Sequence, residues 1–414
     1  MLSALYESAA RVRALRAGAA GSWVEGFANA LTKAGYSAFM ARRHLRSVEH
    51  FAVWATRRGL WANGVTAQAM DGFARHLTRC RCHGYSQANP SLIHAVRLFL
   101  RHLEDIGTLT PVAAERHRSD SPLLCDFQDW MHRQRGTCEG TLDNYGRHIR
   151  ELLVRVGERP DALDARTLRQ FVLEGSQRCG WAAAKQRTTA LRMFLRFLIA
   201  EGHCASGLAG AIPVLAHWRL ASLPRYLPEA DVELLIASCD RTTPIGRRDR
   251  AILLLLARLG LRAGDIVQLR LTDLDWRDGS IRVCGKGRRD VRLPLTAEVG
   301  QALVTYLQKG RPSTSTGVVF VRTRPPIEGF RSHTAVSVIV DGAFRRAGVT
   351  RPSRGAAHLL RHSVATSMLR HGASLQDVAA LLRHRSITTT EIYAKVDVTA
   401  LGAIAQPWPE VSSC

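Results

Sequence analysis

The chain has 414 residues, of which 46% are hydrophobic and 22% charged, and its formal net charge at pH 7 is +23. This length is enough for two or three domains with full hydrophobic cores, and the absence of a long apolar run excludes an integral membrane protein. Because basic residues are spread along the whole chain, we expect a surface that attracts a polyanion, with nucleic acid as the natural partner. The N-terminal segment lacks the pattern of a secretory signal, so a cytoplasmic location is expected.

An internal repeat occupies the first two hundred residues. The run RLFLR at 97–101 matches RMFLR at 192–196, and a segment around Phe73 matches one around Phe171. Apolar residues recur three and four positions apart in both copies, with basic residues on the other face, which is typical of amphipathic helices. Each copy is therefore predicted to form a bundle of about four helices.

The repeat predicts the domain organisation of the N-terminal half. The first bundle is expected at 1–115 and the second at 118–210. Glycines and prolines interrupt the periodicity over 211–228, which predicts a linker there. A third domain then covers 229–400 and leaves a tail at 401–414.

The nine cysteines are dispersed and form no CxxC pair. Cys80, Cys82 and His83 lie close together, but the sequence shows no second pair of ligands beside them, which a zinc site would need. We interpret the cysteines as reduced thiols, and the sequence predicts no metal.

The third domain begins with helices and then a hairpin. A strongly apolar helix is predicted over 249–259, followed by the run GLRAGD, which contains Arg262 and Asp265. Apolar residues then alternate on either side of the Gly-flanked basic turn CGKGRRD, which predicts a β-hairpin with Lys286 at its tip. Only five of the 58 basic residues are lysines, so lysine at this tip is informative.

A helix with two polar side chains on one face is predicted next. His358 and Arg361 are three residues apart in an apolar-periodic segment, so both project from one side of the helix. The segment stops at Gly372, a residue that favours helix ends.

Two N-cap pairs follow this helix. Ser374 with Asp377 predicts the start of a second helix, and Thr388 with Glu391 predicts a third, which carries Tyr393. His384 lies between these two helices.

The side chains of these segments suit phosphoryl transfer. A phenol with a pKa near 10 is a weak nucleophile unless cations and hydrogen bonds stabilise its anion. Guanidinium groups bind phosphate oxygens, and imidazoles donate or accept protons near neutral pH.

The patterns HxLRH and LxHxSIxTTxxY resemble the tyrosine recombinase, or phage integrase, family in residue type and spacing. GLRAGD resembles the first arginine box of that family, and Lys286 lies on the hairpin where the family has its catalytic lysine. The resemblance implies a mainly α fold with a small β-sheet in the catalytic domain. Two N-terminal helical SAM-like bundles would be followed by an α+β tyrosine recombinase catalytic domain.

The resemblance also implies an active site and a reaction without metal or cofactor. Tyr393 would attack a DNA phosphodiester to form a 3′-phosphotyrosyl intermediate, His358 would take its proton, and Lys286 would protonate the leaving 5′-oxygen. The arginines and the second histidine would stabilise the transition state. The complete set is Arg262, Lys286, His358, Arg361, His384 and Tyr393.

Two positions depart from the family pattern. Asp265 stands where the family commonly has Glu, and we expect it to orient Arg262 through an ion pair. Arg383 stands where the family usually has Gly, so a side chain would strain the turn if this position needs a positive φ.

The second bundle resembles the core-binding domain of the family, so its basic residues are candidates for phosphate contacts. These candidates, with one from the hairpin turn, are Arg147, Arg150, Lys185, Arg187, Arg192, Arg196 and Arg288. The first bundle could widen the DNA footprint, bind a second site or hold protomers together.

The predicted function is site-specific recombination of double-stranded DNA for the integration, excision or transposition of a mobile element. The reaction would be carried out by a homo-tetramer on paired sites, with accessory recombinases or DNA-bending proteins as further partners and no membrane. The alternatives are a chromosome or plasmid dimer resolvase, a type IB topoisomerase and a non-catalytic DNA-binding protein. The additional N-terminal bundle favours a mobile element.

Overall fold

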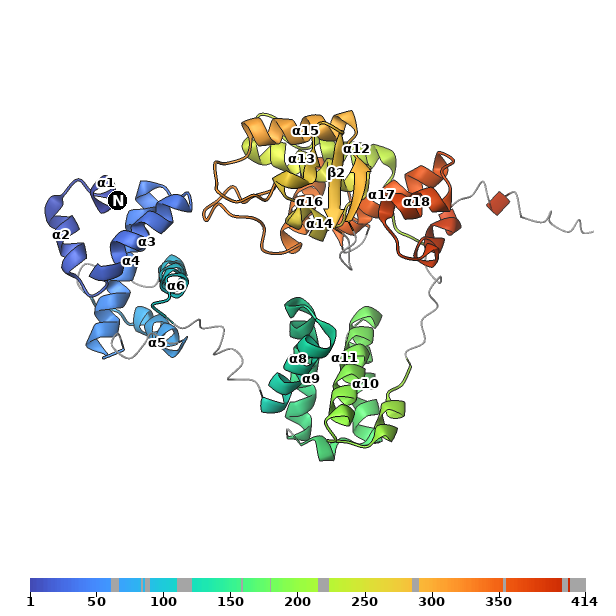
Figure 1. Cartoon of the computed structure of the whole chain (residues 1–414), viewed down its shortest axis with the longest axis horizontal. Coiled ribbons are helices and arrows are strands. Elements are labelled where there is room, and N and C mark those ends of the chain that lie inside the picture. Colours follow the sequence, from blue (N-terminus) through green and yellow to red (C-terminus); the bar gives the residue numbers. More distant parts are fainter. Residues whose placement is uncertain are drawn as a thin grey trace, which may run out of the picture. The chain divides into compact units, whose positions relative to one another are not determined.

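The computed structural model consists mainly of helices (Figure 1). Contacts between Cα atoms divide the chain into two compact units, one of Met1–Ser8, Glu25–Arg43 and Arg219–Cys414, the other of Ala9–Val24 and His44–Trp218. The residues that the structure describes are 1–60, 67–82, 85, 90–109, 121–157, 159–178, 180–214, 223–284, 290–352, 355–396 and 401–402. Lys286 and Arg288 lie outside them, as does most of the predicted tail.

The first repeat copy is helical, as its periodicity predicts. Its core includes Phe51, Phe73 and Phe99, which are fully buried, and the rings of Phe51 and Phe73 meet edge to face with centroids 5.1 Å apart. The helices of this part are α1 (Leu2–Leu5), α2 (Ala9–Ala17), α3 (Gly21–Lys33), α4 (Ala38–Arg57), α5 (Ala67–Thr78) and α6 (Pro90–Asp105).

The second copy contains four α-helices, drawn in green in Figure 1. Phe127 and Phe194 meet edge to face in its core at 5.3 Å between centroids. Phe171 and Phe194, which match Phe73 and Phe99 of the first copy, are also fully buried. The elements are α8 (Pro122–Arg135), α9 (Glu139–Val156), η1 (Pro160–Ala162), α10 (Ala165–Arg178), α11 (Trp181–Ala200) and η2 (Ser206–Ala211).

The remaining helices surround a large apolar core, and α13 is its most buried element. Ala251 to Leu256 on α13 are fully buried, because this stretch is apolar all round and can be stable only inside a core. The elements are α12 (Glu229–Ala237), α13 (Pro244–Leu259), α14 (Ala263–Gln268), η3 (Leu271–Asp273), α15 (Ala297–Lys309), α16 (Thr334–Ala347), α17 (Ala356–Arg370), α18 (Leu375–Leu382), η4 (Ile387–Thr389) and η5 (Glu391–Val396).

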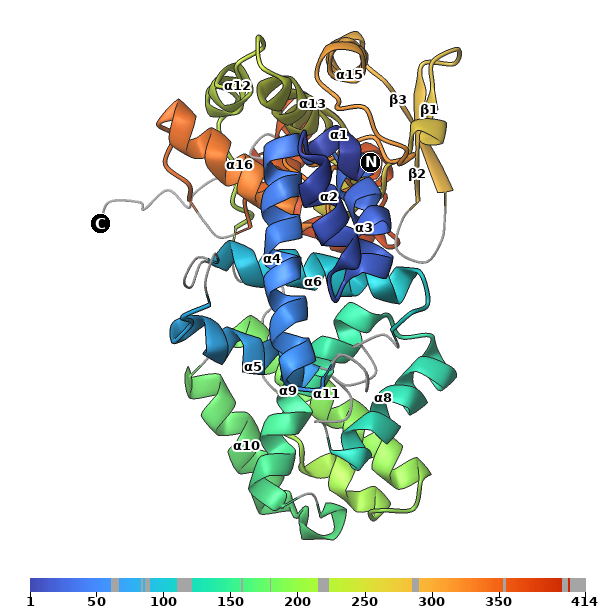
Figure 2. The same ribbon diagram turned by 90° about the vertical axis from the view of Figure 1, so that its left-hand side faces the viewer.

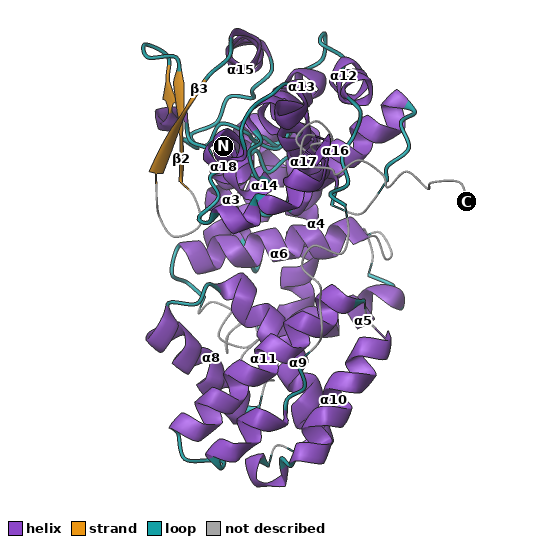
Figure 3. Ribbon diagram, turned by 90° about the vertical axis from the view of Figure 1, so that its right-hand side faces the viewer, coloured by secondary structure: helices purple, strands orange, loops and turns teal. Residues whose placement is uncertain are grey.

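The only sheet of the described residues has three antiparallel strands, β1 (Leu274–Asp275), β2 (Ser280–Cys284) and β3 (Asp290–Pro294). The predicted hairpin is therefore present, and Ile281 on β2 lies opposite Leu293 on β3 with both side chains buried. The strands lie close to α15 (Figure 2 and Figure 3). The predicted fold class, mainly α with a small sheet, is confirmed.

Candidate active site

Helix α17 carries the centre of the candidate site. It begins after Gly355, which has a left-handed backbone with φ +87°, and ends before Gly372, with φ +85°. Glycine adopts such angles without the clash that a Cβ causes, so the sequence fixes both ends of the helix locally. Between them, α17 places His358, Arg361 and His362 within little more than one turn.

Arg361 is only 5% exposed and holds two helix ends together. Its guanidinium donates one hydrogen bond to the carbonyl of Gly260, just after α13, and one to the carbonyl of Leu382, the last residue of α18. A cation suits these carbonyls because helix C-termini carry partial negative charge. Burial, with the nearby Arg262 and Arg383, lowers the pKa of Arg361 to about 9, so it remains protonated at neutral pH.

Asp265 orients Arg262 through the backbone. Its carboxylate accepts a hydrogen bond of 2.8 Å from the Arg262 backbone N–H at the start of α14. The ion pair of the same carboxylate is made with Arg383, and both of these side chains are largely buried. The expected ion pair between Asp265 and the guanidinium of Arg262 is thus replaced by one with Arg383, a residue 118 positions further along the chain.

Arg383 occupies a position that favours glycine. It caps the C-terminus of α18 with φ +54° and ψ +49°, and it is the only non-glycine residue with positive φ among those the structure describes. A Cβ in this conformation costs about 1 kcal/mol or more. The sequence-based concern about this turn is therefore justified, and the buried ion pair with Asp265 offsets the cost.

His384 follows directly and is held by the segment after it. Its Nδ1 lies 2.8 Å from the hydroxyl oxygen of Thr390, which is fully buried. Burial, together with the charges of Arg361 and Arg262, lowers the pKa of His384 to about 4, so the ring is neutral at pH 7. Because Thr390 engages Nδ1, Nε2 is the nitrogen left for a substrate.

The segment that carries Tyr393 differs from the prediction. The capping box of Ser374 and Asp377 opens α18 as expected, but the predicted third α-helix is a pair of 3₁₀ turns, η4 and η5. These tighter turns are short because their hydrogen bonds are less favourable, and they need tertiary contacts to persist.

Tyr393 is 2% exposed and packs against Ala365, Val378 and Leu382. Its hydroxyl oxygen lies 2.6 Å from Nδ1 of His362. Burial raises the pKa of Tyr393 to about 12, although Arg361 opposes this shift. The phenol is therefore protonated at neutral pH and needs a proton acceptor before it can act as a nucleophile.

His362 was not among the residues predicted from the sequence, although it is the last residue of the HxLRH motif. Burial, together with the neighbouring His358 and Arg361, lowers the pKa of His362 to about 4. A neutral imidazole can accept a hydrogen bond at one nitrogen, so Nδ1 can accept the Tyr393 proton. The signal in the sequence was its position four residues after His358, on the same face of the helix.

His358 lies at the exposed edge of the same cluster. Its pKa is lowered by burial of part of the ring and by the charges of Arg361, Arg262 and His333. Electrostatic interactions with Arg361 or Arg262 thus link all five predicted active-site residues that the structure describes. The sixth, Lys286, belongs to the turn between β2 and β3, which is not described.

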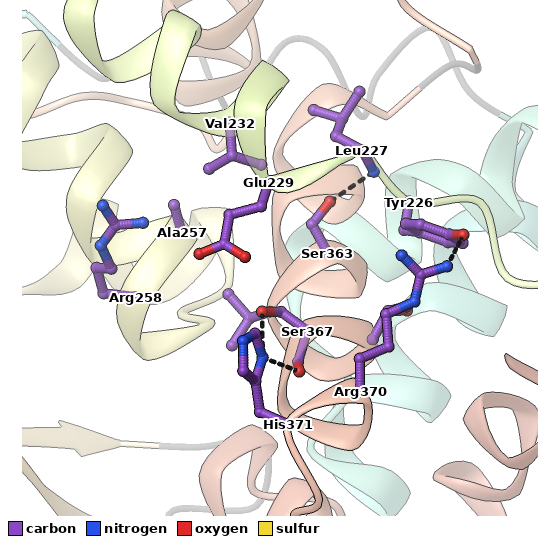
Figure 4. Close-up of a pocket in the computed structure, with 12 residues that line it drawn as sticks. Tyr226, Leu227, Glu229, Val232, Ala257, Arg258, Ser363, Ser367, Arg370 and His371 are labelled. Atoms are coloured by element: carbon purple, nitrogen blue, oxygen red, sulfur yellow. Dashed lines mark hydrogen bonds between the residues drawn. The ribbon is translucent and has the colours of Figure 1, made fainter. Parts of the chain in front are cut away.

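A separate pocket lies against the opposite face of α17 (Figure 4). Leu227 donates a backbone hydrogen bond of 2.8 Å to the hydroxyl of Ser363, and the guanidinium of Arg370 lies 4.8 Å from the ring centre of Tyr226. None of the five predicted active-site residues that the structure describes lines this pocket. It marks where the end of the predicted linker packs on α17, and it is not the candidate active site.

Five of the predicted DNA contacts on the second copy are exposed, and one is buried. Arg187 is 6% exposed, pairs with Glu151 and lies 3.9 Å over the ring centre of Phe171. Arg187 therefore belongs to the core, against the expectation that it contacts DNA. The exposed residues are Arg147, Arg150, Lys185, Arg192 and Arg196.

Comparison with known proteins identifies related chains. Residues 225–399 match the model of the phage integrase family. The chain is 36% identical to "Putative integrase/recombinase y4rA" of Sinorhizobium fredii, over 92% of this chain and 93% of that one. It is also 33% identical to tyrosine recombinase XerC of Xylella fastidiosa, over 69% of this chain and 95% of the relative.

Solved structures share the fold. The XerH site-specific recombinase bound to a palindromic difH substrate superposes with a TM-score of 0.56 at 17% identity, covering 82% of this chain and 95% of XerH. A lambda integrase dimer bound to a core site superposes with a TM-score of 0.51 at 20% identity, covering 64% of this chain and 95% of that one. Because y4rA matches nearly the whole length of this chain and residues 225–399 match the family model, the chain belongs to the tyrosine recombinase, or phage integrase, family.

Proposed function

We propose that the protein is a site-specific DNA recombinase in which Tyr393 cleaves and rejoins double-stranded DNA. The observation that carries this proposal is the pairing of Tyr393 with a neutral His362, beside the buried cation Arg361. A phenol, a proton acceptor and fixed positive charge are what phosphoryl transfer to tyrosine needs.

In the proposed reaction the Tyr393 oxygen forms a bond to the phosphorus of the scissile phosphate and the bond from phosphorus to the 5′-oxygen breaks. The tyrosine proton passes to His362, and the 5′-oxygen takes a proton from Lys286. Arg262 and Arg361 stabilise the charge that grows on the non-bridging oxygens, and His384 adds a hydrogen bond from Nε2. A 5′-hydroxyl of a partner duplex reverses these steps and completes strand exchange.

The assignment of the proton acceptor differs from the sequence prediction. His358 was expected to take the proton, but the hydrogen bond of Tyr393 in the structure is made with His362. His358, at the exposed edge of the cluster, is better placed to contact the phosphate. Tyr393 must become accessible before cleavage, so η5 is expected to shift when DNA binds.

The similarity to y4rA supports a role in a mobile element. That relative, a putative integrase/recombinase, matches 92% of this chain, whereas XerC of Xylella fastidiosa matches 69%. A dimer resolvase remains the second candidate. We further propose a cytoplasmic homo-tetramer on paired sites, as predicted from the family, with accessory recombinases or DNA-bending proteins as partners.

A covalent trapping experiment tests the reaction. The full-length protein would be incubated with nicked suicide substrates made from the ends of its element, and adducts would be separated on denaturing gels. We expect a covalent complex with the wild-type protein and none with Tyr393→Phe, which retains the ring but lacks the nucleophile.

The outcomes distinguish the alternatives. Relaxation of supercoiled plasmid of any sequence would indicate a topoisomerase. Binding to true sites without any adduct would contradict the proposal and favour a non-catalytic DNA-binding protein.

The role of Lys286 is tested separately by changing the leaving group of the DNA substrate. Lys286→Ala should fail to cleave ordinary DNA and recover on DNA with a bridging 5′-sulfur, because a thiolate leaves without protonation. Lys286→Arg is the control that keeps the charge but holds its proton too tightly to act as an acid. Cleavage rates that remain low on the sulfur substrate would exclude Lys286 as the acid.

A further inference from the structure

Four metal-ligating side chains meet in the first repeat copy, far along the chain from the residues of the proposed reaction. They are His50 on α4, His76 on α5, and Cys80 and Cys82 just after α5. One ligand atom from each side chain lies within 4.8 Å of all the others. The sequence pattern predicted no metal, because it set Cys80 and Cys82 beside His83, which lies outside the described residues, and did not show the two histidines that complete the set.

Three of the six distances between the donor atoms of this cluster match the edges of a tetrahedral metal site. Nε2 of His50 lies 3.3 Å from Nε2 of His76 and 3.5 Å from Sγ of Cys80, and Nε2 of His76 lies 3.6 Å from Sγ of Cys82. A tetrahedron with zinc–nitrogen bonds of about 2.05 Å and zinc–sulfur bonds of about 2.3 Å has N···N edges of about 3.3 Å and N···S edges of about 3.5 Å. These three contacts already have the spacing of ligands around one ion, and the remaining distances are within the 4.8 Å that bounds the whole set.

The surroundings favour a closed structural site. His50 and Cys80 are buried, and the ring of His50 is stacked on Tyr85 at 4.3 Å between centroids and meets the edge of Phe73. Zn²⁺ with two thiolates and two neutral imidazoles has no net charge, so it can be buried among aromatic rings at little cost in desolvation.

We propose that His50, His76, Cys80 and Cys82 bind a structural zinc ion that ties the loop after α5 to α4. Mixed nitrogen and sulfur donors in tetrahedral spacing select zinc over magnesium or calcium, which prefer oxygen. Both thiols would lose their protons on binding. All four positions belong to the protein, so this is a closed site without a place for a substrate.

The first test is the metal content of the full-length protein, purified in reducing buffer with any affinity tag removed. We expect about one zinc ion per chain by mass spectrometry of the metal. The cobalt-substituted protein should show the visible bands of tetrahedral Co²⁺ and a thiolate-to-metal charge-transfer band. A protein that binds no zinc after incubation with equimolar Zn²⁺, or a cobalt form without the thiolate band, would overturn the proposal.

Paired cysteine variants test which residues bind. Cys80→Ser/Cys82→Ser should lower the zinc content by about tenfold or more and abolish the charge-transfer band. The matched control is Cys138→Ser/Cys204→Ser, which also removes two thiols but leaves the cluster intact, and it should retain the metal. Equal zinc content in the two variants would refute the assignment.

Zinc content and the cobalt spectrum are measured without DNA cleavage, so they test the zinc site independently of the proposed reaction. If the ligand variant fails to fold, the cobalt spectrum of the wild-type protein still decides, because only cysteine ligation produces the thiolate band. Failure of covalent trapping with normal zinc content would contradict the recombinase proposal alone.

Discussion

At the residue scale, the contact between Tyr393 and His362 defines the chemistry of the site. A tyrosine whose pKa is about 12 is almost entirely protonated at pH 7, so the rate of attack depends on where its proton goes. The neutral ring of His362, 2.6 Å away, is the nearest acceptor for which the structure shows a hydrogen bond.

Replacing His362 should therefore slow cleavage without weakening DNA binding. We expect His362→Leu to lower the single-turnover rate by about 10²- to 10⁴-fold, and His362→Asn, which keeps an acceptor atom, to lose less. The wild-type rate should hold from pH 8 to 6 and fall as the pH approaches 4, because protonation of His362 with its pKa of about 4 removes the acceptor.

His358→Leu is the comparison variant for this experiment. If His362→Leu cleaves like the wild-type protein and His358→Leu carries the full loss, then His358 is the proton acceptor as the sequence first indicated. DNA affinity, measured separately by fluorescence anisotropy, shows whether either loss arises from binding.

At the element scale, the junction between α14 and α18 depends on one buried ion pair. Arg383→Gly relieves about 1 kcal/mol of backbone cost at φ +54°, but it leaves the buried Asp265 carboxylate without its cation, which costs about 3 to 5 kcal/mol. We expect a net loss of about 2 to 4 kcal/mol in the free energy of unfolding, seen as a lower midpoint of thermal unfolding.

A second substitution separates these effects. In Arg383→Gly/Asp265→Asn the amide oxygen can still accept the Arg262 backbone hydrogen bond and neither charge of the ion pair remains, so stability should return to near the wild-type value. The variant with Asp265→Asn alone should be less stable than the wild-type protein, because the buried charge of Arg383 then has no partner. If the double variant loses the sum of the unfolding free energies that the two single variants lose, the ion pair is not what stabilises this junction.

Helix α17 illustrates how one element serves two purposes. One side presents His358, Arg361 and His362 to the candidate active site, while Ser363 and Arg370 hold the segment around Tyr226 and Leu227 (Figure 4). This segment is the end of the predicted linker, so one helix contacts both the linker and the candidate active site.

At the scale of the whole molecule, the net charge of +23 should dominate affinity for DNA of unrelated sequence. If about six phosphates are neutralised, the association constant should fall about 10³-fold between 50 and 200 mM salt. The salt slope is the slope of the logarithm of the association constant against the logarithm of the salt concentration. The triple variant Arg147→Ala/Arg150→Ala/Arg196→Ala should reduce the magnitude of this slope by about three, because each lost phosphate contact reduces it by about 0.9.

A control variant removes the same charge from other exposed positions of the same bundle. Arg133→Ala/Arg166→Ala/Arg169→Ala should change the slope much less. Equal changes in the two variants would mean that total charge, and not the predicted contact residues, determines the affinity. Fluorescence anisotropy over a salt series with a labelled duplex measures both slopes.

The sequence by itself determined the fold class and most of the candidate site. Helical periodicity, glycine at helix ends and the Ser374–Asp377 capping box are local signals, because neighbouring residues satisfy them whatever the rest of the chain does. Spacing within HxLRH likewise placed His358 and Arg361 on one face of α17. The buried hairpin residues Ile281 and Leu293 followed from alternation in the same way.

Tertiary structure alone decided which of these groups became partners. His362 meets Tyr393, Asp265 meets Arg383, Arg187 turns into the core, and His50 and His76 join Cys80 and Cys82. Each pair or cluster joins residues separated along the chain, and its formation depends on how helices pack and what they bury. Sequence patterns report the face on which a side chain lies, whereas burial and packing decide what that side chain contacts.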